Sequence, residues 1–245
     1  MRKLGSWQLL LLAALAGCDL PGRPDPADRP VPAEQVVDFR PLYTMNCAGC
    51  HGADGRLGPA PPLNDPIFLS IVPDDDLLRV IAEGRSVSPA QKTPMPAFLR
   101  DKGGPLTAAQ VKVLAEGIKK QWAPTNAPAR SLPPYRASTT AGPANKIDGA
   151  PVFGRACAGC HGSQGQGGKD GQREVGAIND QAFLALISDQ ELRRFAITGR
   201  PDLGMPAFDG HNGRPAEFHP LSSKEIDDLV AFLASWRRTE SGNGQ

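Results

Sequence analysis

Two identical pentapeptides, Cys47-Ala48-Gly49-Cys50-His51 and Cys157-Ala158-Gly159-Cys160-His161, lie 110 residues apart in this chain. In such a Cys-x-x-Cys-His run, two thiols lie close enough to add to the two vinyl groups of one porphyrin, and the neighbouring imidazole can bind its iron. A thioredoxin-like redox pair would need a βαβ surround, and a zinc site would need further Cys or His at ligand spacing. Identical repetition argues against chance. The sequence therefore predicts two covalently attached haems.

The composition is consistent with two haem domains. The chain has 245 residues, enough for two domains of about 100 residues each. Four of its five cysteines lie in the two motifs, which leaves Cys18 alone and no pair for a disulfide. Two histidines, His211 and His219, lie outside the motifs. The formal net charge of +1 gives no support for nucleic-acid binding, so no nucleic-acid partner is expected.

The first 17 residues have the pattern of a secretory signal. A basic start precedes a short apolar run, which is too short for a membrane span of about 20 residues. The run ends in Leu15-Ala16-Gly17-Cys18, which resembles the lipobox of bacterial lipoproteins. That resemblance implies cleavage after residue 17 and a lipid on Cys18; an ordinary cleaved signal or an uncleaved anchor are the alternatives. We expect a lipid-anchored protein on the periplasmic side of the bacterial cytoplasmic membrane.

Two segments are rich in proline and lack helical or strand periodicity. Residues 18–39 are expected to form an extended tether that holds the first domain away from the membrane. Residues 123–147 are expected to link the domains, and residues 239–245 to form a C-terminal tail.

The two halves repeat beyond the pentapeptides. The matched blocks are Asn64-Asp65 with Asn179-Asp180, Gly84-Arg85 with Gly199-Arg200, and the Met-Pro-Ala-Phe runs that start at Met95 and Met205. The first two pairs are offset by 115 residues and the last pair by 110. The second half therefore gained five residues before its Asn-Asp and lost five before its Met, and we expect loops at both places.

Local signals in both halves are helical. Thr107–Gln110, Ser188–Glu191 and Ser222–Glu225 have the spacing of capping boxes, which begin helices. Apolar residues recur at helical spacing after the first and last of these boxes, as far as Trp122 and Trp236. Each half is therefore predicted to end in an amphipathic helix.

The methionines suggest the second axial ligand of each iron. Met1 is lost with the signal, and Met45 lies only six residues before His51. Met95 and Met205 remain, each 44 residues after its own motif histidine and each next to proline, which stiffens the backbone. A thioether ligand raises the reduction potential of a haem. The ordinary alternative is that both methionines fill gaps in the core.

With Cys-Ala-Gly-Cys-His-Gly, a Pro- and Gly-rich loop and Met-Pro-Ala-Phe, each half resembles class I cytochromes c of the cytochrome c6 and cbb3-associated type. The resemblance covers residues 40–122 and 148–238. It implies an all-α fold, with two cytochrome c class I domains in tandem joined by the Pro-rich linker. In each domain a C-terminal helix would cross the helix that carries the haem motif. Tyr43 with Trp122, and Phe153 with Trp236, are candidates for contacts at those crossings, although each can equally be an ordinary core residue.

The expected sites contain two haem c groups and no catalytic residue. Covalent attachment is assigned to Cys47, Cys50, Cys157 and Cys160, and iron ligation to His51, Met95, His161 and Met205. In the family, a proline after the haem histidine offers its carbonyl to that ring, which orients it. Pro59, Pro61 and Pro62 can do so in the first half, whereas residues 174–177 contain no proline. The second haem is therefore expected to differ in potential.

These features predict a membrane-tethered dihaem electron carrier without substrate chemistry. It would relay single electrons between respiratory or photosynthetic redox complexes or periplasmic dehydrogenases, or act as a subunit of one. The alternative is a dihaem enzyme of the peroxidase or sulfur-compound oxidase type, which needs an iron that is open or unusually ligated. His211 and His219 are the only replacements for Met205 as a ligand, and both are expected on a surface loop.

Overall fold

The computed structural model of the chain describes residues 25, 29–58, 60–88, 91–92, 95–126, 130–138, 142–170 and 173–237. The chain divides into two units, Met1–Val36 and Val37–Gln245. The described part of the first unit contains a short 3-10 helix, η3 (Ala33–Gln35), with no buried residue. The signal segment and Cys18 lie outside the described residues. No helix among the described residues is long and apolar enough to cross a membrane.

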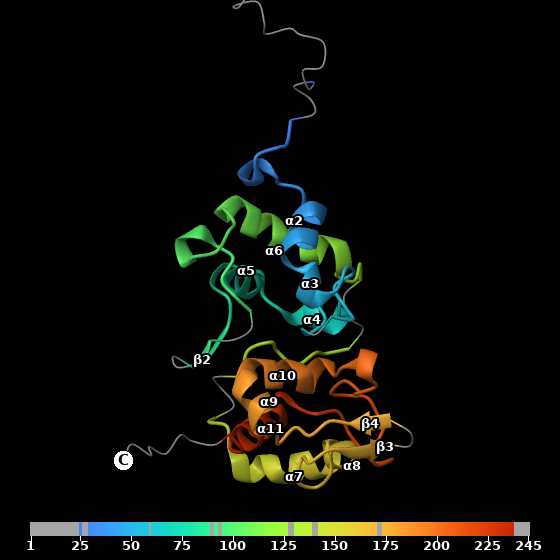
Figure 1. Ribbon diagram of the computed structural model, residues 1–245. Coiled ribbons are helices and arrows are strands. Elements are labelled where there is room, and N and C mark those ends of the chain that lie inside the picture. Colours follow the sequence, from blue (N-terminus) through green and yellow to red (C-terminus); the bar gives the residue numbers. More distant parts are fainter. Residues whose placement is uncertain are drawn as a thin grey trace, which may run out of the picture. The chain divides into compact units, whose positions relative to one another are not determined.

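The second unit contains both haem motifs, and each lies in a helical domain (Figure 1). The elements of the first domain are α2 (Phe39–Asn46), α3 (Ala48–His51), α4 (Pro66–Ile71), α5 (Asp74–Glu83), β1 (Ser86–Ser88), β2 (Gln91–Lys92), η4 (Arg100–Lys102) and α6 (Ala108–Trp122). Those of the second are α7 (Lys146–Ala156), α8 (Ala158–His161), β3 (Gly168–Asp170), β4 (Arg173–Val175), α9 (Gln181–Leu186), α10 (Asp189–Thr198), η5 (Pro201–Leu203) and α11 (Ser223–Ala234).

Three helices begin at the capping residues that the sequence predicts. Thr107 caps α6, Ser188 caps α10 and Ser222 caps α11, and each forms a complete capping box with the residue three positions later. Two glycines with positive φ, Gly84 and Gly199, end α5 and α10. Both helices therefore stop where the chain turns toward its Met-Pro-Ala-Phe run.

The first domain has its core between the last helix, α6, and the helices packed on it. Leu114 and Ile118 of α6 are almost completely buried, as is Phe68 of α4. At the crossing of α2 and α6, Tyr43 meets Trp122 edge to face, with ring centroids 5.0 Å apart. The aromatic contact expected at this crossing is confirmed.

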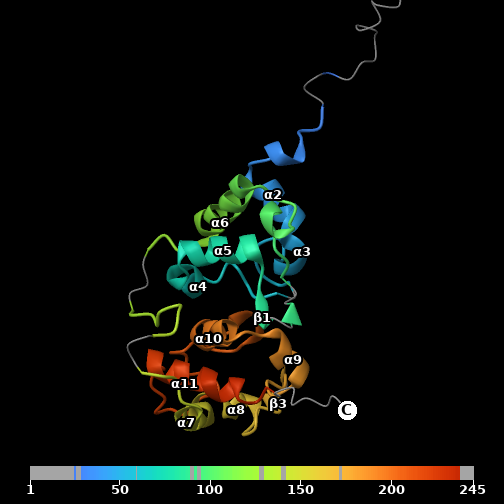
Figure 2. The ribbon, with the colours of Figure 1, turned by 90° about the vertical axis from the view of Figure 1, so that its left-hand side faces the viewer.

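The second domain repeats this arrangement with α7 and α11, which lie side by side in both views of the ribbon (Figures 1 and 2). Gly149 lets the two helices approach, because a Cβ there would lie 2.1 Å from the carbonyl oxygen of Asp228. Phe153 meets Trp236 edge to face, with ring centroids 5.2 Å apart, which confirms the second expected contact. Ile226 and Leu229 of α11 fill the core.

Two short antiparallel hairpins supplement the helices. β1 pairs with β2 just before the Met95 run, and β3 pairs with β4 after the second haem motif. The second hairpin lies in the glycine-rich stretch that follows the second haem motif. The hairpin lies between His161 and Asn179, the interval in which the second half is five residues longer than the first.

The segment between the domains packs against both of them. Tyr135 is only 5% exposed, and its ring centroid lies 6.1 Å from that of Phe68 in the first domain. Arg136 donates from Nε to Asp76 of α5 over 2.6 Å. From the second domain, Arg193 donates from Nε to the Tyr135 carbonyl over 3.1 Å. Residues 130–138 are therefore held by side chains from both sides, although their proline content alone suggests a spacer.

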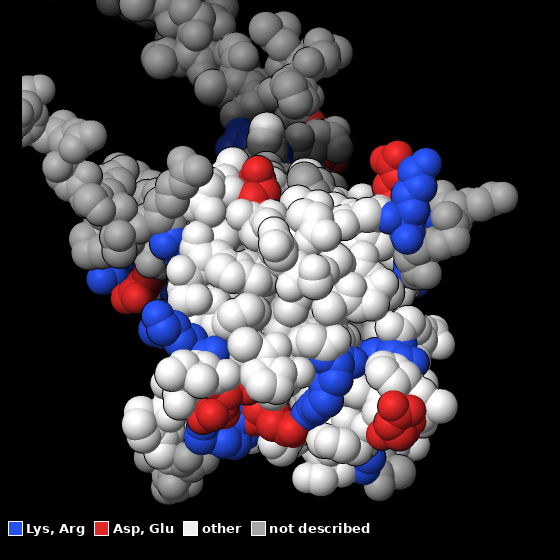
Figure 3. Space-filling model, turned by 90° about the horizontal axis from the view of Figure 1, so that it is seen from below, with Lys and Arg blue, Asp and Glu red and all other residues white. Residues whose placement is uncertain are grey.

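Figure 3 views the molecule from below and looks onto the second domain. A broad area without charged side chains occupies the middle of this face, and Lys, Arg, Asp and Glu lie around its edge. The charges of both signs are interspersed there, as the near-neutral total charge suggests.

Candidate haem sites

The two haem motifs fold in the same way. In each, a single-turn helix follows the first cysteine, so that the second cysteine and the histidine lie one turn further on. The histidine amide donates to the carbonyl of the first cysteine over 2.9 Å in both copies, His51 to Cys47 and His161 to Cys157. No disulfide joins the four motif cysteines. The sequence identity of the motifs thus extends to their backbone hydrogen bonds.

The first thiol of each motif does not have the lowered pKa of a reactive redox pair. Burial, reinforced by the nearby Cys50, raises the pKa of the Cys47 thiol to about 12. Burial raises the pKa of the Cys157 thiol to about 11, although Arg214 acts in the opposite direction. Reactive Cys-x-x-Cys pairs depend on a lowered pKa that exposes a thiolate. The buried motif thiols therefore fit covalent attachment better than disulfide exchange.

Each motif histidine has a backbone carbonyl beside its ring. His51 contacts the Pro61 carbonyl through Nδ1 at 2.9 Å, and His161 contacts the Gly176 carbonyl through Nδ1 at 3.4 Å. Burial lowers the pKa of both imidazoles below the usual value, against the raising effect of these carbonyls. A neutral ring that donates from Nδ1 leaves Nε2 free to bind a metal. Of the three prolines suggested by the sequence for the first domain, Pro61 makes the contact.

The Gly-Arg pairs that repeat in the sequence hold the methionine runs. In the first domain the amide of Arg85 donates to the Met95 carbonyl over 3.1 Å. In the second domain Arg200 and Met205 exchange two backbone hydrogen bonds, of 3.0 and 2.9 Å. The preceding glycines allow the close approach, because a Cβ on Gly84 or Gly199 would lie 2.6 or 2.5 Å from the methionine carbonyl oxygen.

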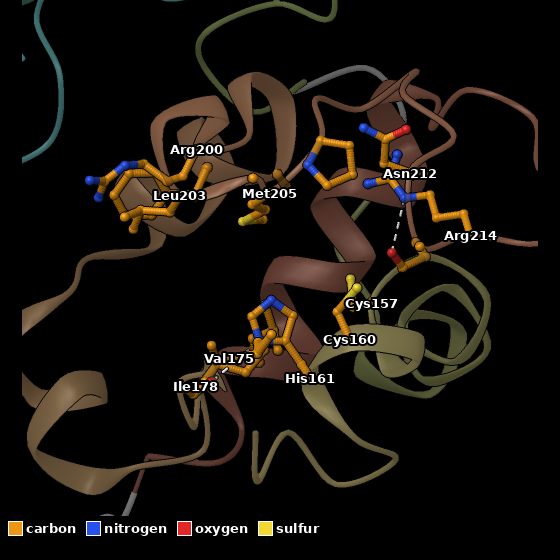
Figure 4. Close-up of a pocket in the computed structure, with 18 of the residues that line it drawn as sticks. Cys157, Cys160, His161, Val175, Ile178, Arg200, Leu203, Met205, Asn212 and Arg214 are labelled. Atoms are coloured by element: carbon orange, nitrogen blue, oxygen red, sulfur yellow. Dashed lines mark hydrogen bonds between the residues drawn. The ribbon is translucent and has the colours of Figure 1, made fainter. Parts of the chain in front are cut away.

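In the second domain, the predicted site residues meet at one cavity. It has a volume of about 790 Å³, within the usual range for cofactor pockets. Figure 4 shows His161 and Met205 on opposite sides of the cavity, with Cys157 and Cys160 next to His161. Most of its other walls are apolar, from residues that include Leu192, Phe195, Leu221, Leu229 and Leu233.

The remaining predicted residues are placed as follows. In the first domain, Cys47, Cys50 and His51 lie in the motif turn, and Met95 lies in the run held by Gly84 and Arg85. His211 and His219 are exposed in the segment before α11, as expected. Met45 is 79% exposed, which agrees with setting it aside as a ligand.

The sequence pattern did not single out Arg214, which also lines the second cavity. Its guanidinium donates to the carbonyls of Ala156 at 3.0 Å, Ala207 at 2.7 Å and Gly210 at 2.6 Å, and lies 4.3 Å from the centroid of the Phe218 ring. Arg214 thus connects Ala156, at the end of α7, to the segment after Met205. It lies in a loop without periodicity, so no sequence signal marks it.

Comparison with known proteins agrees with these sites. Residues 147–237 match the family model for cytochrome c, and residues 34–116 match the model for cytochrome c oxidase, cbb3-type, subunit III. The chain therefore belongs to the class I c-type cytochromes. It carries two such domains in tandem and binds two covalent haem c groups.

No curated protein matches the chain. Among solved structures, the Kuenenia stuttgartiensis reducing HAO-like protein complex Kustc0457/Kustc0458 is similar at 19% sequence identity and a TM-score of 0.41. The match covers 86% of this chain and 100% of that chain. A similarity of this size carries no argument about function or assembly.

The residues present fit haem c. The second cavity offers two thiols and a neutral imidazole on one wall, a thioether on the opposite wall, and apolar side chains between them. A soft sulfur and an imidazole on opposite faces are the donor set of electron-transfer haem. The first domain shares two of the backbone contacts, from the His51 amide to the Cys47 carbonyl and from the Arg85 amide to the Met95 carbonyl.

Proposed function

We propose that this chain is a membrane-tethered dihaem cytochrome c that relays single electrons between redox proteins. Its partners would be respiratory or photosynthetic complexes or periplasmic dehydrogenases, and it works free or as a subunit of one of them. Bound haem c supplies a one-electron couple in each domain. The electron-transfer class follows from the two cytochrome c domains.

The observation that carries the proposal is the position of His161 and Met205 on opposite walls of one cavity. We propose that His161 and Met205 would hold the iron of the second haem, and that His51 and Met95 would hold that of the first. Cys47 and Cys50, and Cys157 and Cys160, would form the thioether bonds. An iron closed on both sides transfers electrons without binding a substrate, which is why we favour a carrier over an enzyme.

The chain's own residues would keep each site rigid. The Gly-Arg backbone holds each methionine run in place, and the carbonyls of Pro61 and Gly176 orient the histidine rings. Apolar side chains such as Leu192 and Leu229 exclude water from the second cavity. A site that changes little between two charge states loses little energy to reorganisation when an electron arrives.

Carbon monoxide binding and the Met-to-iron absorption band test this assignment. The wild-type protein should show the band and bind little carbon monoxide when reduced. Met95→Ala and Met205→Ala should each remove about half of the band and open one iron to carbon monoxide. Met45→Ala is the matched control, because Met45 is 79% exposed, and should change neither signal. Ready binding of carbon monoxide by the wild-type protein would instead favour the enzyme class.

The tether is supported by the sequence of residues 1–39. We propose that Cys18 becomes the lipid-bearing first residue and that the protein faces the periplasm. Cys18→Ala should release the holoprotein from the membrane fraction into the soluble periplasmic fraction, with both haems retained. If Cys18→Ala remains in the membrane fraction after a salt wash, the lipid anchor is wrong.

A further inference from the structure

Arg194 of α10 is a charged residue of the second domain that is enclosed by the first domain. It is only 3% exposed. Its Nη2 donates to the carbonyl of Pro62, and its guanidinium carbon lies 3.5 Å from the centroid of the Phe68 ring. A buried charge is costly unless it is paired or hydrogen-bonded, so a specific contact of this kind is expected to have a role.

The partner carbonyl is next to the one that orients the first haem histidine. Pro61 accepts from Nδ1 of His51 at 2.9 Å, and Pro62 accepts from Arg194. Proline fixes its own φ and restricts the residue before it, so two successive prolines form a stiff unit. Arg194 therefore holds the same rigid segment that positions the ring of His51.

A second contact between the domains is an ion pair, formed three residues before Arg194 on α10. Arg85 of the first domain and Glu191 of the second form an ion pair with 2.6 Å between Nη1 and Oε1. Both side chains are mostly buried, at 16% and 12% exposed. The backbone amide of the same Arg85 donates to the Met95 carbonyl over 3.1 Å. Charged side chains of both domains therefore lie next to the first haem site.

The same helix is fixed to the segment between the domains. Gln190 donates to the Tyr135 carbonyl over 2.7 Å, and Arg193 donates to the Pro134 carbonyl over 3.0 Å. Tyr135 in turn packs on Phe68, the ring beneath Arg194. The placement of Arg194 is therefore supported both by its own contacts and by its neighbours on α10.

We propose that Arg194 is an interdomain positioning residue, through which the second domain fixes the Pro61–Pro62 segment behind His51 and places a permanent positive charge beside the first haem site. This inference rests on the proposed function, because it concerns the potential of an electron-transfer haem. A fixed positive charge disfavours the oxidised iron, so Arg194 raises the reduction potential of the first haem. Burial lowers the pKa of Arg194 to about 10, which leaves it protonated at neutral pH.

Potentiometric titration of the full holoprotein tests the proposal. The measurements use a Met205→His background, in which the nitrogen ligand moves the second haem to lower potential and separates the two titrations. Arg194→Gln should shift the oxidised-to-reduced ratio of the first haem about tenfold toward the oxidised form, or about 59 mV for one electron. Arg194→Lys keeps the charge and should restore most of the shift.

Glu191→Gln distinguishes a charge effect from a loosened interface. Glutamine can still complete the capping box of α10, but the charge that neutralises Arg85 is gone. The potential of the first haem should therefore rise, opposite to Arg194→Gln. Arg79→Gln is the matched control, because Arg79 has the equivalent place on α5 and its side chain is 56% exposed. It should shift the ratio less than twofold.

The proposal is overturned if Arg194→Gln leaves the first potential unchanged, or if Arg194→Gln and Glu191→Gln shift it in the same direction. If Arg194→Gln fails to fold, the sign of the Glu191→Gln shift decides alone. These outcomes are separate from a failure of the proposed function, which would appear in the wild-type protein as carbon monoxide binding and a missing Met-to-iron band.

Discussion

Helices α5 and α10 occupy the same place in the two domains but have different surroundings. Both follow an Asn-Asp block and end at a glycine before the methionine run. On α5, Leu78 is 41% exposed and Arg79 faces solvent. On α10, the corresponding residues are Arg193 and Arg194, and both are buried. A repeated helix can therefore keep its role at the haem site and gain a second role as an interface.

The buried pair of Arg193 and Asp227 gives the largest predicted difference between these helices. Their side chains are 3% and 6% exposed, and they are joined by a direct ion pair. Asp227→Asn should destabilise the second domain by about 3–5 kcal/mol, because it leaves the Arg193 charge buried without its partner. Amide hydrogen exchange in α11, compared with α6, measures this change domain by domain.

Leu78→Ala is the control at the equivalent place in the first domain. It should cost about 1 kcal/mol or less, since the side chain is already partly in water. Equal losses of protection in α6 and α11 after Asp227→Asn would show that the two domains unfold as one unit. The burial of Arg193 on α10 would then stabilise both domains equally, rather than the second domain alone.

The glycines at the ends of α5 and α10 should behave alike. Gly84 and Gly199 have φ of +72° and +66°, and a Cβ at either would collide with the methionine run. We expect Gly84→Ala and Gly199→Ala each to cost about 1–3 kcal/mol and to weaken the Met-to-iron band of its own domain. Gly154→Ala is the control, because a Cβ there meets nothing within 4 Å. A band that survives both substitutions would argue against Met ligation.

The two histidine contacts differ more subtly. The Nδ1 to carbonyl distance is 2.9 Å at Pro61 and 3.4 Å at Gly176. A shorter hydrogen bond makes the imidazole more basic, and a more basic ligand stabilises the oxidised iron. If only this hydrogen bond differed between the two sites, the second haem would have the higher reduction potential. The charge of Arg194 acts in the opposite direction on the first haem, so each effect needs its own variant.

Gly176→Pro should make the second site resemble the first. Val175 lies in β4 and thus has the extended backbone that a following proline requires. A stiffer carbonyl should strengthen the His161 contact by about 0.5 kcal/mol, which lowers the potential of the second haem by about 20 mV. Pro61→Gly should raise the reduction potential of the first haem by a similar amount. Redox titration checks both, and shifts of the same sign would contradict the argument.

The parts that the sequence predicted are those with local or periodic signals. A capping box spans four residues, and the haem motif spans five, so the contacts can be read directly from spacing. The aromatic crossings followed from the repeat, because Tyr43 and Phe153 occupy matched places before their motifs. Met95 and Met205 are predicted as ligands because their interval from the histidine is constant, and that assignment stays a prediction, although Met205 does line the second cavity.

The interface could not be predicted, because its contacts join residues far apart in the chain. Arg194 lies 132 residues from Pro62, and a charged residue on an amphipathic helix is ordinarily expected to face solvent. Arg79, at the same place in the first domain, does so. The packing of Tyr135 on Phe68 likewise joins residues far apart in the chain.

The smallest predicted difference concerns the caps of the last helices. Glu225 completes the box of α11 and pairs with Arg155, whereas the neutral Gln110 completes that of α6. Burial would raise the pKa of Glu225, but hydrogen bonds from Ser222 and Arg155 outweigh it and hold this pKa below the usual value of about 4.3. Its stabilising effect is therefore complete above that value and is lost as the pH falls through the lowered pKa of the folded state.

Glu225→Gln gives the second domain the cap chemistry of the first. It should cost about 0.5 kcal/mol at pH 7, because the charged hydrogen bond to Arg155 is weakened while the box remains. It should also remove the part of the acid sensitivity that Glu225 contributes. Amide exchange in α11 between pH 7 and pH 3, with α6 as the internal reference, measures this dependence. If α11 in the variant still loses protection as steeply as in the wild type, the acid sensitivity of the second domain does not come from its cap.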